Sequence, residues 1–298
     1  MEPEISLLCK DLVKTYPGVI AMDHINFELR KGEVHALLGE NGAGKSTLIK
    51  SIAGAHQCDS GTITIDGKEF HSLTPLQAKE MGVEVVYQEF NQMPSLSVAE
   101  NIYLTELRGK RIVADQREFE RKAAELFKEM NLDLNPKVKV ASLTNGYKQM
   151  VEIAKAISKP TTKILILDEP TSGLDPVSRD DLLDLLRSLC EQDGVSILFS
   201  THITSDLDAC ADDVTYLQNG TVAQSVSLAG FTAPWKKLTG PETALAPALR
   251  GALRGLRVHR GEFEALYPSD LPCPAGCREE LADLQTVMVY LEREVETV

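Results

Sequence analysis

One glycine-rich turn limits what this chain can fold into more than any other feature. Residues 39–47 read Gly-Glu-Asn-Gly-Ala-Gly-Lys-Ser-Thr, after an apolar run at 34–38 and before a run of helical character at 48–52. The spacing Gly-x4-Gly-Lys-Ser between a buried strand and a helix is typical of a P-loop, which cradles nucleotide phosphates. An accidental match would require the flanking strand and helix to be coincidences as well.

The turn offers three kinds of phosphate contact. Gly42 and Gly44 let the backbone turn without a Cβ, so that successive N–H groups and the positive end of the following helix face phosphate oxygens. Lys45 is expected to reach the β- and γ-phosphates, and the Ser46 hydroxyl to hold Mg2+. The residues predicted to bind the nucleotide here are Asn41, Gly42, Ala43, Gly44, Lys45, Ser46 and Thr47.

Length and charge exclude several classes of protein. The chain has 298 residues, a formal net charge of -13 and six cysteines. This charge disfavours nucleic acid as a general partner, because such binding needs Lys and Arg to neutralise phosphates. No apolar run approaches the roughly 18 residues of a membrane span, and the acidic N-terminus lacks the apolar core of a signal peptide. We therefore expect a cytoplasmic protein with reduced thiols.

A second anchor lies at residues 164–169, where four aliphatic residues precede Asp168 and Glu169. Such a run predicts a strand buried on both faces, as central parallel strands are, and ligands bind at the carboxyl ends of these strands. Asp168 is placed to orient Mg2+, and Glu169 to polarise an attacking water as a general base. The alternative is a solvated pair of acids at a strand end, which the P-loop in the same chain disfavours.

Two further side chains each have a functional and a structural interpretation. Tyr16 lies a little upstream of the P-loop, so its ring either stacks on adenine or packs on neighbours at a strand end. His202 follows an apolar run at 195–199. Its imidazole is either polar surface or a contact for the γ-phosphate and the attacking water.

The rest of the first 225 residues alternates between strand and helix. Residues 62–65 lead into an Asp-Gly hairpin turn, and residues 83–87 predict another strand. A capping box at Ser97 and Glu100 opens a helical region at about 90–155. The core face of one of its helices is predicted at Phe119, Ala123, Leu126, Phe127 and Met130.

Taken in order, these motifs resemble those of an ABC ATPase. The ordered set consists of the P-loop, Gln88, the segment 143–149, Asp168 with Glu169, the segment 172–175 and His202. The resemblance covers residues 5 to about 225. It implies an α/β fold, a P-loop NTPase of ABC type with a mixed sheet, an antiparallel β subdomain and a helical insertion. Residues 1–225 would form the ATPase domain, and residues 226–298 a small C-terminal accessory region.

The resemblance also implies roles for single residues and partners. Tyr16 would stack on the adenine of ATP, Gln88 would link Mg2+ and the attacking water to a membrane subunit, and His202 would be the switch histidine. Asp175 would lie in the loop that crosses a dimer interface. Such ATPases act as head-to-tail pairs, so a second ATPase subunit, identical or related, is expected. Membrane permease subunits would hold the pair at the inner face of the cytoplasmic membrane.

The signature segment departs from the family pattern Leu-Ser-Gly-Gly-Gln. It reads Leu143-Thr144-Asn145-Gly146-Tyr147, in which Thr144 keeps a hydroxyl for the γ-phosphate and Gly146 keeps close backbone approach. Asn145 replaces a glycine, and Asn tolerates left-handed backbone angles better than most residues. With Tyr147 in place of glutamine, we expect slower hydrolysis at any composite site that uses this signature.

The direction of transport is left open by the residues. Up to about residue 158 the chain resembles the first half of simple-sugar importer ATPases, whereas from residue 164 onward it is similar to single-domain ATPases of small bacterial exporters. Import of a sugar-like solute, with a solute-binding protein as a further partner, is the favoured hypothesis, and an exporter ATPase is the alternative. A soluble ABC protein or a weakly hydrolysing regulatory module is the rival of another class. An ATPase subunit does not reveal the transported compound.

Residues 226–298 carry weaker signals. Glycines and prolines from 230 to 247 suggest a linker, and Arg residues between 250 and 260 suggest a solvated face. Cys273 and Cys277 either bind a metal or are loop thiols. One face of a final helix is predicted from Leu281, Leu284, Met288 and Leu291.

Overall fold

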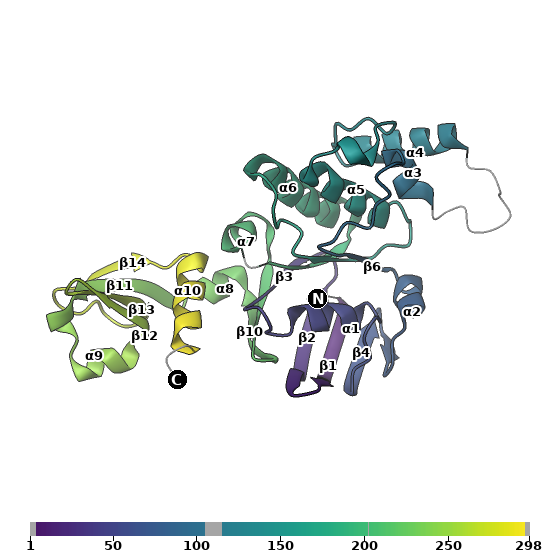
Figure 1. The fold of residues 1–298 in the computed structure, drawn as a ribbon. Helices are drawn as coiled ribbons and strands as arrows, with labels where there is room; N and C mark the ends of the chain where they lie inside the picture. The colour runs from purple at the N-terminus through teal and green to yellow at the C-terminus, as the bar shows by residue number, and fades with distance from the viewer. Residues whose placement is uncertain (1–3, 105–114, 202, 296–298) are drawn as a thin grey trace. The chain divides into compact units, whose positions relative to one another are not determined.

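The structure is a computed structural model that describes residues 4–104, 115–201 and 203–295. The chain divides into two compact units, the first comprising 1–202 with 210–225 and the second 203–209 with 226–298. Figure 1 shows the elements of each unit. No helix among the described residues is long and apolar enough to cross a membrane.

An antiparallel sheet of four strands forms one layer of the first unit. Its order is β2 (Val19–Arg30), β1 (Ile5–Tyr16), β4 (Ser60–Ile65) and β5 (Lys68–Phe70). Alternate residues of β2, such as Ile25 and Leu29, are fully buried while their neighbours are exposed, because one face of this sheet packs on the core. The hairpin predicted after residue 65 is confirmed by the positive φ of Asp66 and Gly67.

A mixed sheet of six strands carries the P-loop. Its order is β10 (Thr221–Ser227), β9 (Asp213–Gln218), β3 (Val34–Gly39), β8 (Ser196–Ser200), β7 (Ile164–Asp168) and β6 (Val83–Val86). The strands from β9 to β6 pair in parallel. Their carboxyl ends therefore share one edge of the sheet, where ligands bind in α/β folds. The predicted mixed sheet with an antiparallel subdomain is confirmed.

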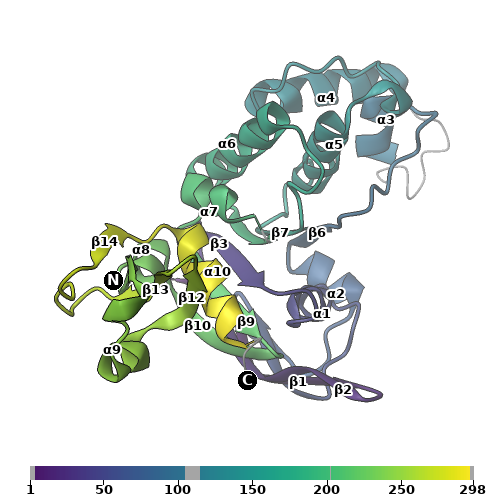
Figure 2. The same cartoon turned by 60° about the vertical axis from the view of Figure 1, so that its left-hand side comes forward.

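Helices follow the strands or lie between β6 and β7. Between those two strands come α3 (Val98–Tyr103), α4 (Gln116–Glu129), a short 3-10 turn (Val140–Ser142) and α5 (Asn145–Ile157), which Figure 2 shows together. The predicted capping box is present, since Ser97 Oγ accepts from Glu100 N and the Glu100 carboxylate accepts from Ser97 N. The remaining helices of this unit are α1 (Lys45–Ile52), α2 (Pro75–Glu80) and α6 (Pro176–Asp193).

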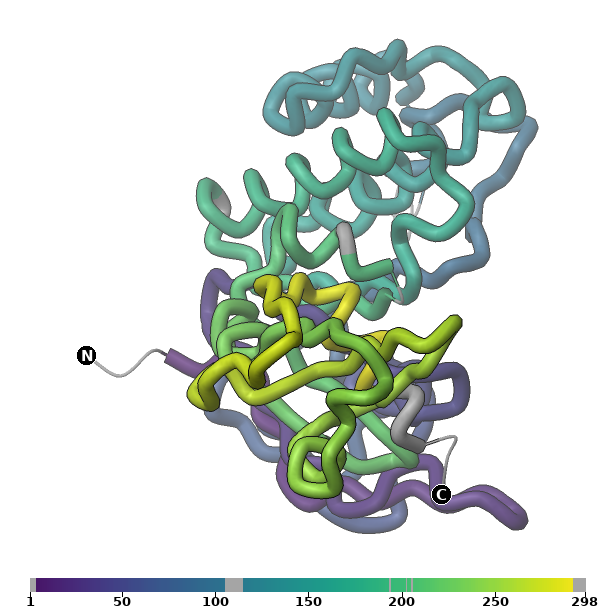
Figure 3. The backbone as a smooth tube through the Cα atoms, turned by 90° about the vertical axis from the view of Figure 1, so that its left-hand side faces the viewer, coloured from purple at the N-terminus to yellow at the C-terminus, as the bar shows by residue number. Residues whose placement is uncertain are grey.

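The second unit contains its own sheet and core, drawn from green to yellow in Figure 3. The sheet order is β12 (Arg254–His259), β13 (Glu262–Pro268), β11 (Trp235–Pro241) and β14 (Arg278–Leu281). Its helices are α7 (Thr204–Cys210), α8 (Leu228–Thr232), α9 (Pro247–Ala252) and α10 (Leu284–Val295), with a 3-10 turn at Glu242–Ala244. A small core joins Leu238, Leu253, Phe263, Ala265 and Tyr267.

Two sequence interpretations in this unit are wrong. The glycines and prolines from 230 to 247 do not form a linker, since a Cβ on Gly240 would lie 2.8 Å from the Cys277 sulfur. This glycine serves close packing of strands, which composition alone does not distinguish from flexibility. Leu281 belongs to β14 and is 96% exposed, so it is not part of α10, whose buried residues include Leu284, Val287, Met288 and Tyr290.

Candidate nucleotide site

The P-loop adopts a backbone that only glycine accepts easily. Gly44 precedes α1 with a φ of +106°, and a Cβ there would lie 2.5 Å from the carbonyl oxygen of Ala21. No side chain caps α1, whereas α3 to α6 are capped by Ser97, Asp115, Thr144 and Asp175. An uncapped helix N-terminus preceded by this turn fits a phosphate, which would accept the outward N–H groups of the first turn.

Lys45 lies over the loop that precedes it. The residue is 7% exposed, and its ammonium donates to the carbonyl oxygens of Gly39 at 2.7 Å and Glu40 at 3.0 Å. The positive charge is therefore held at the carboxyl end of β3. Phosphate oxygens are stronger acceptors for an ammonium than peptide carbonyls, so this side chain suits the role predicted for it.

Ser200 joins the two predicted acids. β7 and β8 pair in parallel with Asp168 opposite Ser200, and the Ser200 hydroxyl donates to Asp168 Oδ1 at 2.7 Å. The same hydroxyl accepts from Glu169 N at 3.1 Å. Glu169 has a φ of +51°, an uncommon conformation for a residue other than glycine. Strained backbone of this kind clusters at functional sites, so β8 fixes both acids at the edge that carries the P-loop.

Gln88 and His202 are placed less completely. Gln88 is exposed two residues after β6, which pairs with β7. Burial and then the charge of Asp168 raise the pKa of the neighbouring Tyr87 above its usual 10.0, which places this segment near the Asp168 carboxylate. His202 lies outside the described residues, so its predicted role stays a prediction.

Tyr16 is held by groups that the sequence did not single out. Its hydroxyl lies 2.7 Å from His56 Nδ1, and its ring is 39% exposed at the end of β1. Asp59 accepts hydrogen bonds from the backbone N–H and hydroxyl of Thr15 and from Lys14. These bonds lower the pKa of Asp59 from 3.8 to about 2, the Thr15 hydroxyl contributing most. Both stacking on adenine and packing at a strand end remain compatible with this exposure.

The signature segment is the N-terminus of α5. Thr144 caps the helix by accepting from Tyr147 N at 3.4 Å. Asn145 is the first helical residue and has no positive φ, so the argument that asparagine tolerates left-handed angles does not apply here. Gly146 also has helical angles, but a Cβ on it would lie 2.4 Å from Ser178 Cβ. Close contact with α6, rather than backbone freedom, is what demands this glycine.

Asp175 caps α6 beside the signature. Its carboxylate accepts from Val177 N, from Ser178 N and from the Ser178 hydroxyl at 2.6 Å. The Ser178 side chain and then its N–H hold the pKa of Asp175 below its usual 3.8. Ser178 thus contacts both Gly146 and Asp175, which brings two predicted site residues together through a third that the sequence did not indicate.

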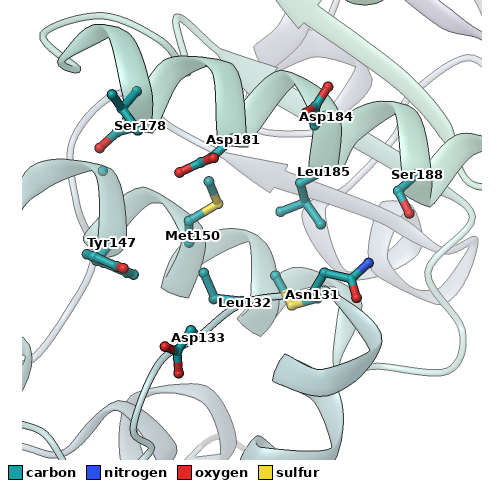
Figure 4. Close-up of a pocket in the computed structure, with 13 residues that line it drawn as sticks. Asn131, Leu132, Asp133, Tyr147, Met150, Ser178, Asp181, Asp184, Leu185 and Ser188 are labelled. Atoms are coloured by element: carbon teal, nitrogen blue, oxygen red, sulfur yellow. The ribbon is translucent and has the colours of Figure 1, made fainter.

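A cavity of about 520 Å³ opens beside this contact. Figure 4 shows Tyr147 and Met150 on α5 facing Ser178, Asp181 and Asp184 on α6. Tyr147 is 39% exposed, so its ring is available to whatever approaches the start of α5. The position where the family carries glutamine therefore presents an aromatic surface instead.

Ser200, Ser178, His56 and Asp59 were missed at the sequence level. Ser200, Ser178 and His56 each contact a predicted site residue that is more than 30 positions away in the chain, and Asp59 bonds Thr15 beside Tyr16. Of these four, only Ser200 could have been predicted from the sequence, because it ends a predicted parallel strand at the same edge as Asp168.

Comparison with known proteins gives the family. A family model described as ABC transporter matches residues 22–172. A ribose import ATP-binding protein of Streptomyces avermitilis is 43% identical over 207 residues, which are 70% of this chain and 39% of that protein. A putative ribose/galactose/methyl galactoside import ATP-binding protein of Burkholderia cenocepacia is 43% identical over 218 residues, which are 72% of this chain and 42% of that protein. The chain thus spans about two fifths of the length of these relatives.

A solved structure agrees with these matches. The dimeric structure of a bacterial ABC transporter cassette superimposes with a TM-score of 0.65 at 27% identity, covering 74% of this chain and 98% of that cassette. The family model includes the P-loop and the acids after β7, and the fold places them at one edge of the six-stranded sheet. The chain belongs to the ABC transporter family, as its ATP-binding cassette.

Proposed function

We propose that this chain is the ATP-binding and ATP-hydrolysing subunit of an ABC transporter. The observation that carries the proposal is the Ser200 hydroxyl, which holds Asp168 and the backbone of Glu169 at the edge where Lys45 lies. Residues 1–225 would act as the ATPase domain and residues 226–298 as an accessory region.

Each predicted site residue would have a defined task. Lys45 and the backbone of residues 41–47 bind the phosphates of ATP, with Tyr16 against the adenine. Ser46, Gln88 and Asp168 would hold Mg2+, and the ion would supply positive charge to offset that of the phosphates. Glu169 accepts the proton of the attacking water, and His202 contacts the γ-phosphate.

The signature needs a second subunit. Thr144 and Gly146 lie on α5 and Asp175 on α6, so they would face the ATP held by the P-loop of a partner cassette. The dimeric cassette to which this chain is similar supports a pair of ATPase subunits. Both a homodimer and a heterodimer satisfy this requirement.

Import of a sugar-like solute is the transport function that the relatives favour. Their names assign them to import of ribose, galactose and methyl galactoside. We propose that membrane permease subunits hold this chain at the inner face of the cytoplasmic membrane, with a solute-binding protein delivering the sugar.

The substitution Glu169→Gln distinguishes ATP binding from ATP hydrolysis. Purified wild type with Mg2+ and γ-labelled ATP should release phosphate, whereas Glu169→Gln should retain ATP and hydrolyse it at least about a hundredfold more slowly. Glu40→Gln is the matched control, because this exposed glutamate lies in the P-loop segment and contributes only its backbone carbonyl. If neither the wild type nor Glu169→Gln retains labelled ATP, the proposal is wrong.

The direction of transport is tested by measuring sugar uptake and efflux in cells. Cells that carry this chain with its permease subunits should accumulate labelled ribose or galactose, and Glu169→Gln should abolish the accumulation. Loss of labelled sugar from preloaded cells, dependent on Glu169, would instead identify an exporter.

A further inference from the structure

A buried cluster of metal-ligating side chains lies at the other end of the P-loop strand. Glu33 immediately precedes β3, His35 lies within it, and Asp213 is the residue opposite His35 on β9. The side chains of Glu33, His35 and Asp213 are 10%, 3% and 13% exposed. The P-loop follows the carboxyl end of β3, so this cluster is at the opposite edge of the sheet and is separate from the nucleotide site.

The donor atoms have the spacing of one coordination sphere. An oxygen of Glu33, a ring nitrogen of His35 and an oxygen of Asp213 all lie within 4.8 Å of one another. His35 Nδ1 is 3.1 Å from Glu33 Oε1. A tetrahedral ion with bonds of about 2.1 Å holds its ligands about 3.4 Å apart, so the groups need little movement to bind one ion.

The hydrogen bonds around His35 orient Nδ1 toward this point. Nε2 lies 2.8 Å from the Thr215 hydroxyl, which in turn lies 2.7 Å from the Ser225 hydroxyl. When Nε2 carries the proton and Thr215 donates to Ser225, the lone pair of Nδ1 faces the Glu33 carboxylate. In this tautomer Nδ1 and the carboxylate are both acceptors, and a cation between them would replace the hydrogen bond that Nδ1–H donates to Glu33 in the other tautomer. A metal-ligating imidazole normally has such an oxygen acceptor on its other nitrogen.

The charges nearby leave room for a divalent cation. Arg30 pairs with Asp213 at 2.8 Å, and its backbone N–H donates to Glu33. The Arg30 side chain is 42% exposed, so the guanidinium can turn to water when an ion replaces it. Asp212 adds a third carboxylate, which accepts from Val34 N. Glu33 and Asp213 therefore share one permanently charged partner, Arg30, which also lies 3.8 Å from Glu28.

We propose that Glu33, His35 and Asp213 form a binding site for a divalent transition metal, of which Zn2+ is the best match. One imidazole and two carboxylates are ligands that Zn2+ accepts in a tetrahedral site with a water as the fourth ligand. Because Glu33 and His35 lie at the start of β3 and Asp213 lies on β9, the ion would tie the P-loop strand to its neighbour at the edge opposite the nucleotide site. The site does not depend on the proposed transport function.

Zn2+ titration of the full chain, stripped of metal and without nucleotide, tests the site. Calorimetry should show one ion per chain with a micromolar or tighter dissociation constant. Asp213→Asn and His35→Gln should each weaken binding at least about tenfold. Zn2+ should also raise the melting temperature of the wild type but not that of Asp213→Asn.

Two control variants remove competing sites. His71→Gln takes away an exposed imidazole that lies 3.8 Å from Glu69, and the double variant Cys273→Ser, Cys277→Ser removes an exposed and a half-buried thiol. Both should bind Zn2+ as the wild type does. Loss of binding in either control, or unchanged binding in Asp213→Asn and His35→Gln, would place the ion elsewhere and overturn the proposal.

Diffraction at the zinc absorption edge locates the ion without any variant. Wild-type crystals grown with equimolar Zn2+ should show an anomalous peak between Glu33, His35 and Asp213. A peak at another position, or folded wild type that binds no Zn2+, would mean that a proton and Arg30 alone balance these carboxylates.

Discussion

The P-loop and the signature segment both depend on a glycine, but for different physical reasons. Gly44 has a φ of +106° and no room for a Cβ beside Ala21. Gly146 has ordinary helical angles and lacks room only because Ser178 packs against it. The first requirement is written into the local backbone, whereas the second comes from a neighbouring helix. A glycine pattern therefore indicates conformation at one site and packing at the other.

The largest effect is expected from Gly44→Ala. The added Cβ meets the Ala21 carbonyl at 2.5 Å in a backbone that alanine disfavours, so the P-loop must move. We expect ATP affinity to fall at least a hundredfold, about 2.8 kcal/mol, when nucleotide binding is followed by calorimetry. Gly42→Ala is the matched control. Gly42 also has a positive φ, but a Cβ added to it would have no neighbouring atom within 4 Å. Equal losses in the two variants would show that φ alone matters here.

Gly146→Ala should have the next largest effect, and a second substitution, Ser178→Gly, should largely restore activity. The new Cβ pushes α5 from α6, which displaces the signature, and we expect turnover to fall about tenfold in steady-state ATPase assays. Ser178→Gly removes the atoms that clash, so the double variant should recover much of the loss despite losing the hydroxyl bonded to Asp175. A double variant no better than Gly146→Ala would refute the packing explanation.

The two altered signature positions should respond differently. Asn145 adopts helical angles, so Asn145→Gly gains no needed freedom and costs only about 0.3 kcal/mol of helix propensity, with turnover changing less than about twofold. Tyr147→Gln removes the exposed ring beside the capped N-terminus and should raise turnover several-fold.

The contributions of residues 145 and 147 to turnover can be separated by measuring phosphate release by each single variant and by the double variant. A rise that requires Asn145→Gly would contradict the assignment of residue 145 as an ordinary helical position.

The smallest effect is expected on the pH dependence of stability, through the Asp59 carboxylate that bonds Thr15 next to Tyr16. Asp59 has a pKa of about 2 in the fold, against a usual 3.8. The folded state therefore prefers the ionised carboxylate, so this stabilisation is complete above pH 3.8 and disappears as pH falls toward 2. NMR titration should show the Asp59 pKa rising toward 3.8 in Thr15→Val, which lacks the hydroxyl donor. An unchanged pKa would mean that Lys14 and the backbone N–H of Thr15 suffice.

The candidate site could be predicted from the sequence wherever its chemistry lies in consecutive residues. The P-loop and the Asp168-Glu169 pair each follow an apolar strand, and both were found from spacing alone. The capping box at Ser97 was found for the same reason, since its bonds join residues three apart. The glycines and prolines from 230 to 247 were misread as a linker, because glycine in a packed strand and glycine in a linker look alike in one sequence.

The sequence by itself determined that strand, glycine turn and helix succeed one another, because backbone conformation and apolar periodicity act over a few residues. Only the tertiary structure decided that Ser200 bonds the two acids, that Ser178 needs a glycine opposite it, and that Glu33 and His35 meet Asp213. These contacts join residues up to 180 positions apart. They exist because parallel pairing and helix packing, which no local pattern specifies, bring the segments together.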